Sequence, residues 1–254
     1  MNEVLLTALG VGGSTVIGAL LGFLFKKPSH KMNDIILSFA AGVMLAAAVI
    51  GLIVPSLEYG EGILPLFITA AGILAGAVCL NLIDKVVPHL HKMTGVDQEA
   101  HPDRNASLDK VLLFVIAIAI HNLPEGIAAG VSFGDDGNLS RALSVAGGIA
   151  LQNIPEGMVI IAPMIAAGMS RTRTFLIALS TGLVEVVGTL IGYFAVSVST
   201  AILPFALAFA GGTMLYVISD EMIPETHAHG NERSATYTLL LGFAVMLAFD
   251  FLLG

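Results

Sequence analysis

Residues 111–133 read VLLFVIAIAIHNLPEGIAAGVSF, an apolar stretch long enough to cross a bilayer, interrupted at 121–126 by the polar hexapeptide HNLPEG. A similar hexapeptide, QNIPEG at 152–157, interrupts the next apolar stretch in the same way. An ionised side chain at the bilayer centre costs about 2.5–3.5 kcal/mol on insertion scales, so carboxylates there usually serve a function. The two hexapeptides therefore predict a polar site inside a membrane.

The composition is that of a membrane protein built from helices. Hydrophobic residues make up 56% of the chain and charged residues only 12%, with a mean hydropathy of +0.90, whereas soluble domains carry about 25% charged residues. The net charge of -8 does not indicate a nucleic-acid partner, because the acidic residues fall in short loops and in the apolar runs. The single Cys79 excludes an intramolecular disulfide and a thiolate cluster. We expect an all-α polytopic protein with lipid around it.

Apolar runs of about 20 residues define the expected membrane helices. One membrane transport domain, 1–254, is expected, with its fourth and fifth helices kinked at their prolines around a central metal site. The eight predicted helices are 3–25, 34–57, 62–84, 109–133, 140–167, 173–197, 201–219 and 236–254.

The basic residues predict the orientation of these helices. All of the 11 lysines and arginines except Arg141 lie in the loops after the first, third, fifth and seventh runs or within two residues of the end of such a loop. Because basic residues favour the cytoplasmic side, those loops are expected inside the cell and both termini outside. A plasma membrane, the inner membrane of a prokaryote, is the simplest location for such a compact chain.

The fourth helix offers a group of metal-type ligands on one face. His121 and Glu125 are four residues apart, and Asn122 borders the same face. Pro124 cannot donate a hydrogen bond to the carbonyl of Ile120, so a free carbonyl is expected beside these side chains. Broken helices of this kind are tolerated in membranes where protein or a wet cavity satisfies the backbone.

The fifth and sixth helices complete this group. Gln152, Asn153 and Glu156 repeat the pattern in the fifth helix, and Glu185 stands alone in the apolar run of the sixth. The three glutamates carry -3 when ionised, which one divalent ion reduces to -1. Oxygen ligands with one imidazole and no thiolate suit Zn²⁺, Fe²⁺, Mn²⁺ or Cd²⁺ and argue against Cu⁺. The metal is expected as a transported substrate, without an organic cofactor.

The two hexapeptides are accompanied by three further motifs, SFAAGVML at 38–45, GLVE at 182–185 and SDEMIPETH at 219–227. With these motifs the chain resembles the ZIP family of divalent-metal transporters, in particular its GufA-like prokaryotic branch. The resemblance covers essentially the whole chain. It implies transport of divalent metal ions, zinc above all, toward the cytoplasm by alternating access, and it implies that the protein is a homodimer. It also implies that helices one, four, five and six move against a scaffold of helices two, three, seven and eight.

The resemblance further implies two adjoining metal sites bridged by Glu125 and Glu156. Asn153 stands where close relatives can carry Asp, and the missing charge is expected to weaken the second site. The first implied site consists of His121, Glu125, Gln152 and Glu156 with Met44 nearby, and the second of Asn122, Glu125, Asn153, Glu156 and Glu185.

Polar residues in the cytoplasmic loops form two further candidate groups. A possible loop relay comprises His89, His91 and His101, although a solvated polar loop has the same composition. A possible cytoplasmic exit at the end of the seventh helix comprises Asp220, Glu221, Glu225, His227 and His229.

Two classes of function compete with a transporter. A membrane hydrolase with a two-metal centre would also use paired carboxylates, but the chain has no HExxH motif and no nucleophile near the cluster, so no enzyme is expected. A divalent-cation channel, or a carrier of another solute that uses metal as a structural clamp, remains as the main alternative.

Overall fold

The computed structural model is helical in each long segment that it describes, and the described residues include no strand. The all-α, polytopic class predicted from the sequence is confirmed, with seven helices in the described part long and apolar enough to cross a membrane. The predicted fourth helix, 109–133, is described only from residue 119. The structure describes residues 2–24, 29–86, 119–120, 122–134, 139–166 and 168–253.

The observed helices agree with the predicted runs to within a few residues, except at the seventh. The helices are α1 (Asn2–Gly22), α2 (His30–Ala46), η1 (Ala47–Ile53), α3 (Val54–Ser56), α4 (Leu64–Val86), η3 (Ser132–Gly134), α6 (Leu139–Ala166), α7 (Arg171–Val198), η4 (Thr200–Ile202), α8 (Leu203–Val217), η5 (Ile218–Met222), α9 (Ile223–Thr226) and α10 (Glu232–Leu253), and residues 122–131 are also helical.

Two of the spans contain a proline that follows a π-helical turn. The span from α2 to α3 passes through η1 before Pro55, and the span from α8 to α9 passes through η5 before Pro224. In each, the residue before the proline donates its N–H five residues back, from Val54 to Val49 and from Ile223 to Ile218. The wider turn accommodates the missing proline N–H without ending the helix. The seventh span therefore continues to Thr226 rather than ending at the predicted residue 219.

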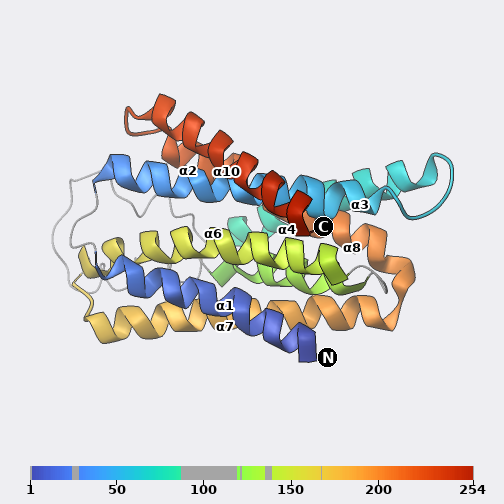
Figure 1. Cartoon of the computed structure of the whole chain (residues 1–254), viewed down its shortest axis with the longest axis horizontal. Helices are drawn as coiled ribbons and strands as arrows, with labels where there is room; N and C mark the ends of the chain where they lie inside the picture. Colours follow the sequence, from blue (N-terminus) through green and yellow to red (C-terminus); the bar gives the residue numbers. More distant parts are fainter. Residues whose placement is uncertain are drawn as a thin grey trace.

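The helices form two bundles. The first bundle consists of α1, α6, α7 and the helix 122–131, and the second of α2, α3, α4, α8 and α10 with their π-helical turns. Figure 1 shows α1, α6 and α7 along one side and α2 and α10 along the other. Within the first bundle α1 packs on α6 and α7; within the second, α2 packs on α10 and α4 on α8.

Helices within each bundle touch backbone to backbone at glycines. A Cβ added to Gly12 of α1 would collide with the carbonyl oxygen of Gly182 in α7, and one on Gly126 would collide with the Glu185 carbonyl. In the second bundle Gly42 of α2 meets the Leu239 carbonyl of α10. Small residues permit this close approach in membrane helix packing. Each bundle is consequently tightly packed internally.

The helix α6 of the first bundle packs against α2, η1 and α10 of the second. The Val145 side chain fills the space over Gly51, and the Met246 side chain covers Gly148. Near the same end of α6, Ser144 Oγ donates a hydrogen bond to Asp250 Oδ1 of α10 at 2.6 Å.

An ion pair joins the bundles one turn earlier in α6. An Arg141 guanidinium nitrogen lies 3.0 Å from a Glu58 carboxylate oxygen, in the turn that follows α3. In the predicted orientation, this end of α6 faces outside.

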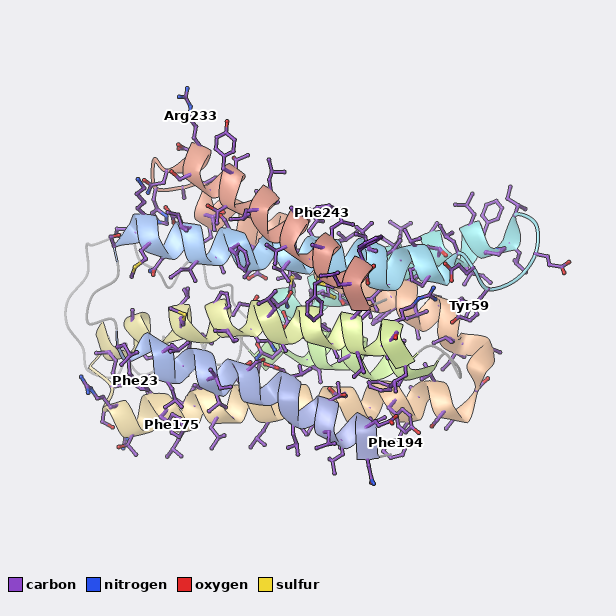
Figure 2. The ribbon with its side chains drawn as sticks, in the orientation of Figure 1. Phe23, Tyr59, Phe175, Phe194, Arg233 and Phe243 are labelled. Atoms are coloured by element: carbon purple, nitrogen blue, oxygen red, sulfur yellow. The ribbon has the colours of Figure 1, made fainter. Side chains whose placement is uncertain are left out.

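The exterior of the molecule is apolar. Figure 2 shows Phe175 and Phe194 of α7 pointing away from the bundles, and half of the Phe194 surface is exposed. Leu6 of α1 and Phe251 of α10 are 70% and 85% exposed. Apolar exposure on this scale is rare in soluble monomers. It agrees with a protein whose surroundings are the hydrocarbon of a membrane.

Candidate metal centre

A cluster of polar side chains is buried inside the first bundle, where the sequence predicted the site. Its members come from all four helices of that bundle and are each at most 3% exposed. They are Thr15 of α1, Asn122 and Glu125 of the helix 122–131, Gln152 and Asn153 of α6, and Glu185 of α7.

The Glu185 carboxylate accepts hydrogen bonds from three neutral donors. Its Oε1 accepts from Thr15 Oγ1 at 2.5 Å and from the amide of Asn122. Its Oε2 accepts from the amide Nδ2 of Asn153. A hydrogen bond to a charged group contributes about 1.5–3 kcal/mol. These three bonds therefore satisfy both Glu185 oxygens and tie four helices together.

The Glu125 carboxylate is only half satisfied. Its Oε1 accepts a hydrogen bond from Gln152 Nε2 at 2.7 Å. Within the described part of the chain, Glu125 Oε2, Gln152 Oε1 and Asn153 Oδ1 are buried without a hydrogen-bond partner. An unsatisfied buried acceptor costs about 1–3 kcal/mol. Three such oxygens are acceptors that a cation can satisfy, and oxygen ligands suit a borderline or hard divalent ion.

The helical spacing of α6 explains part of this arrangement. Gln152 and Glu156 are four residues apart and share one face of α6, which stays helical through Pro155. Glu156 is partly buried and lies near enough to Glu125 and Glu185 for their charges to interact. The predicted kink at Pro155 stays a prediction.

Two predicted ligands of the centre are not joined to it by the described contacts. His121 lies outside the described residues. Met44 is 1% exposed and belongs to the main apolar core, so its role as a ligand stays a prediction. Among the residues that the structure describes, no three His, Cys, Asp or Glu side chains form a group that could hold a metal ion. The described part of the centre thus relies on amide as well as carboxylate oxygens.

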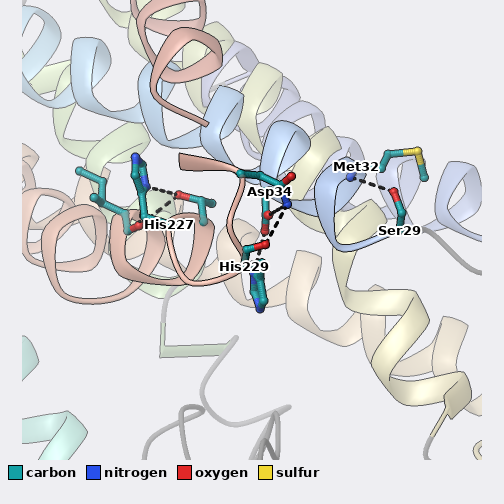
Figure 3. Close-up of polar contacts among 8 residues, drawn as sticks. Ser29, Met32, Asp34, His227 and His229 are labelled. Carbon is teal, nitrogen blue, oxygen red and sulfur yellow. Dashed lines mark hydrogen bonds and ion pairs between the residues drawn. The ribbon is translucent and has the colours of Figure 1, made fainter. Parts of the chain in front are cut away.

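The predicted cytoplasmic exit residues do not form one cluster. His227 Nδ1 lies 2.8 Å from the Ile223 carbonyl oxygen of α9 (Figure 3). Its Nε2 lies 3.1 Å from Thr236 Oγ1 in the first turns of α10. Asp220 is exposed in η5, whereas Glu221 is partly buried and has a polar partner. The candidate Glu225 is partly buried in α9. The loop-relay residues His89, His91 and His101 lie outside the described residues.

His229 faces a different partner, the aspartate near the start of α2. Its Nδ1 lies 2.9 Å from Asp34 Oδ1, and Asn231 Nδ2 donates to Asp34 Oδ2 at 2.9 Å (Figure 3). The His30 ring stacks on the His229 ring with centroids 4.9 Å apart. The Asp34 carboxylate is only 3% exposed, so these contacts pair a buried charge and fix the segment after α9 against α2.

Sequence reasoning missed Thr15 as a member of the centre. Thr15 and Ser14 are adjacent hydroxyl residues in the middle of an otherwise apolar, glycine-rich span. That position was the available signal, but the partner of Thr15, Glu185, is 170 residues away in the sequence. Nothing local in the sequence indicates which way the Thr15 hydroxyl points.

A membrane-spanning helical bundle with a buried carboxylate and amide cluster defines a class of protein, the membrane transporters of cations. The profile of the family described as ZIP zinc transporter matches residues 97–250. The chain belongs to the ZIP zinc transporter family.

Relatives cover almost the whole chain. It is 40% identical over 259 residues to the zinc transporter GufA of Myxococcus xanthus, with all of both chains covered. It is 38% identical to the zinc transporter ZIPB of Bordetella bronchiseptica, over 95% of this chain and 78% of the relative. It is 31% identical to the human zinc transporter ZIP11, over 99% of this chain and 97% of the relative. The membership in the GufA-like branch predicted from the hexapeptides is confirmed.

Proposed function

We propose that this chain carries divalent transition-metal cations across the membrane toward the cytoplasm, with zinc as the main substrate and iron, manganese or cadmium as possible others. The observation that carries the proposal is the set of three unpartnered buried oxygens, on Glu125, Gln152 and Asn153, inside a membrane-spanning bundle. The family and the zinc transporters to which the chain is similar support the choice of metal.

The charges near these oxygens suit one divalent ion. Glu125, Glu156 and Glu185 together carry -3 when ionised, which one such ion reduces to -1. Moving uncompensated charges out of water costs several kcal/mol per ion, so a cation that offsets most of this negative charge is favoured within a membrane. His121, one residue before Asn122, would supply the imidazole that zinc favours.

Alternating access is proposed to move the first bundle against the second. The hydrogen bonds of Glu185 join the four helices of the first bundle, and glycine contacts hold each bundle together. Between the bundles, the Ser144–Asp250 and Arg141–Glu58 side-chain pairs join the N-terminal end of α6 to the second bundle. Breaking these two pairs would let the bundles separate at the end that is predicted to face outside, which would open the metal centre to that side. This division agrees with the one that the family resemblance implies.

The cellular setting is part of the proposal. The distribution of basic residues supports outside termini, and the bacterial relatives support the plasma membrane of a prokaryote. The exposed apolar exterior supports contact with lipid. A homodimer is proposed from the family resemblance alone. Since the relatives are transporters, the hydrolase alternative is set aside.

Uptake of radioactive zinc into liposomes that contain purified protein tests the proposal. We expect saturable uptake by the wild type and almost none by Glu125→Gln, which has nearly the same shape without the charge. Zinc flux that is unchanged in Glu125→Gln would refute the site. Unit conductance steps in bilayers would instead indicate a channel, and organic-solute uptake at fixed zinc would indicate a metal-clamped carrier.

A further inference from the structure

The buried cluster contains two carboxylates in opposite hydrogen-bonding situations. Both oxygens of Glu185 accept hydrogen bonds from neutral donors, whereas one oxygen of Glu125 has no partner in the described chain. Both side chains are buried to the same degree, 0% and 1% exposed. Hydrogen bonding, rather than burial, therefore distinguishes them.

The donors to Glu185 also fix the orientation of an amide. A carboxylate accepts hydrogen bonds and cannot donate them when ionised, so Asn153 must present its NH₂ group to Glu185. Its Oδ1 then points away from Glu185 and is one of the three unpartnered oxygens. Asn153 Nδ2 also lies 3.3 Å from the Val11 carbonyl of α1, which holds the amide in this orientation.

Thr15 controls how the Glu185 carboxylate is held. It is the donor from α1, at 2.5 Å, and it shares Glu185 Oε1 with the Asn122 amide. Hydrogen-bonded groups behind a ligand orient it, and their loss typically weakens metal binding by about 10–100-fold.

From these contacts we infer that Thr15 is a positioning residue and Glu185 a supporting carboxylate, which together aim the Asn153 oxygen at a single cation bound through Glu125. This inference rests on the proposed function and deepens it, because it assigns one cation per chain. Asn153 is neutral, so two divalent ions would exceed the -3 charge of the three glutamates and leave the cluster with +1.

Equilibrium dialysis of zinc against the purified full-length protein in detergent tests the inference. We expect one ion per chain for the wild type, about tenfold weaker binding for Thr15→Val, and recovery to the wild-type affinity in Thr15→Ser, which restores the hydroxyl. Glu185→Gln is expected to keep one ion per chain at about 10–100-fold lower affinity. In liposomes, Thr15→Val should raise the KM for zinc more than it lowers the maximal rate.

Thr181→Val is the matched control. Thr181 is also a buried threonine beside Glu185 on α7, but its hydroxyl donates to the Ala178 carbonyl of its own helix at 2.9 Å. We expect wild-type zinc affinity in this variant. A comparable loss in Thr181→Val would overturn the inference, because any change of packing would then suffice.

The remaining outcomes separate this inference from the proposed function. Wild-type affinity in Thr15→Val, or two ions in the wild type and one in Glu185→Gln, would overturn the inference while leaving the transporter intact. Unaltered zinc binding in Glu125→Gln would instead contradict the proposed site itself. If Thr15→Val is poorly folded, Glu185→Gln and its ion count decide the question.

Discussion

Replacing Asn153 by aspartate should exchange a favourable contact for a repulsive one. Asn153 donates a hydrogen bond to the buried Glu185 carboxylate, and a bond of this kind contributes about 2 kcal/mol. In Asn153→Asp that bond is lost, and two carboxylates about 4 Å apart repel each other by about 4 kcal/mol at an effective dielectric constant of about 20. Asn153→Ala loses only the hydrogen bond. Without metal, the aspartate variant should thus be less stable than the alanine variant.

Zinc should reverse this order. The new carboxylate, with Glu185, supplies the charge that a second cation needs, and each ion bound at 100 times its Kd stabilises the folded protein by about 2.7 kcal/mol. We therefore expect the Tm of Asn153→Asp to rise more with zinc than that of the wild type or of Asn153→Ala.

The assay is thermal unfolding of the three purified proteins in detergent at pH 7.5, first with a chelator and then across a zinc titration. Cobalt or cadmium can replace zinc where zinc causes aggregation. Equal Tm values for Asn153→Asp and Asn153→Ala in chelator, together with equal responses to zinc, would refute the reasoning. That result would mean that the Asn153 amide does not face Glu185 in solution.

Three further predictions concern transport into liposomes. Glu125→Ala and Glu156→Ala should each abolish zinc uptake, and a rate above about half the wild-type rate at equal protein content would contradict their assignment. Uptake at subsaturating zinc should fall as the external pH drops from 7.5 to 5.5, because protons compete with metal for carboxylates; equal rates at the two pH values would refute this competition. Ser144→Ala removes a hydrogen bond to Asp250 worth about 1.5–3 kcal/mol, whereas Glu58→Ala removes an exposed ion pair worth about 0–1 kcal/mol. Ser144→Ala should therefore change the maximal rate of zinc uptake more than Glu58→Ala does. The opposite order would argue that these contacts do not close the outer side of the transporter.

The membrane spans could be predicted from the sequence because hydrocarbon imposes a simple rule. Each span must be apolar over about 20 residues and satisfy its backbone internally, so the start and end of most helices follow from hydropathy. The seventh span was the exception. Asp220 and Glu221 suggested a loop, whereas the structure keeps them in the π-helical turn η5 before Pro224.

The residues of the central cluster could also be predicted, but their relations could not. Carboxylates and amides are conspicuous in apolar runs, and their helical spacing places Gln152 and Glu156 on one face. Which carboxylate is saturated with donors depends on how α1 meets α7, and that contact is set by the close approach of Gly12 to Gly182. Such packing between distant segments is not encoded in any local pattern.

The same limit applies at the cytoplasmic end. His227 and His229 look equivalent in the sequence, two residues apart in a polar segment. The structure gives them different surroundings, because His227 contacts Ile223 of α9 and Thr236 of α10, whereas His229 pairs with Asp34 of α2. The contact that distinguishes them spans 195 residues of sequence.

The anomalous scattering of zinc in crystals of the zinc-loaded protein tests the central claim most directly. A zinc peak is predicted at coordination distance, about 2.0–2.2 Å, from Glu125 Oε2, with the Gln152 and Asn153 amide oxygens turned toward it. Ordered zinc found only elsewhere, for example beside His229 and Asp34, with none near Glu125, would contradict the account.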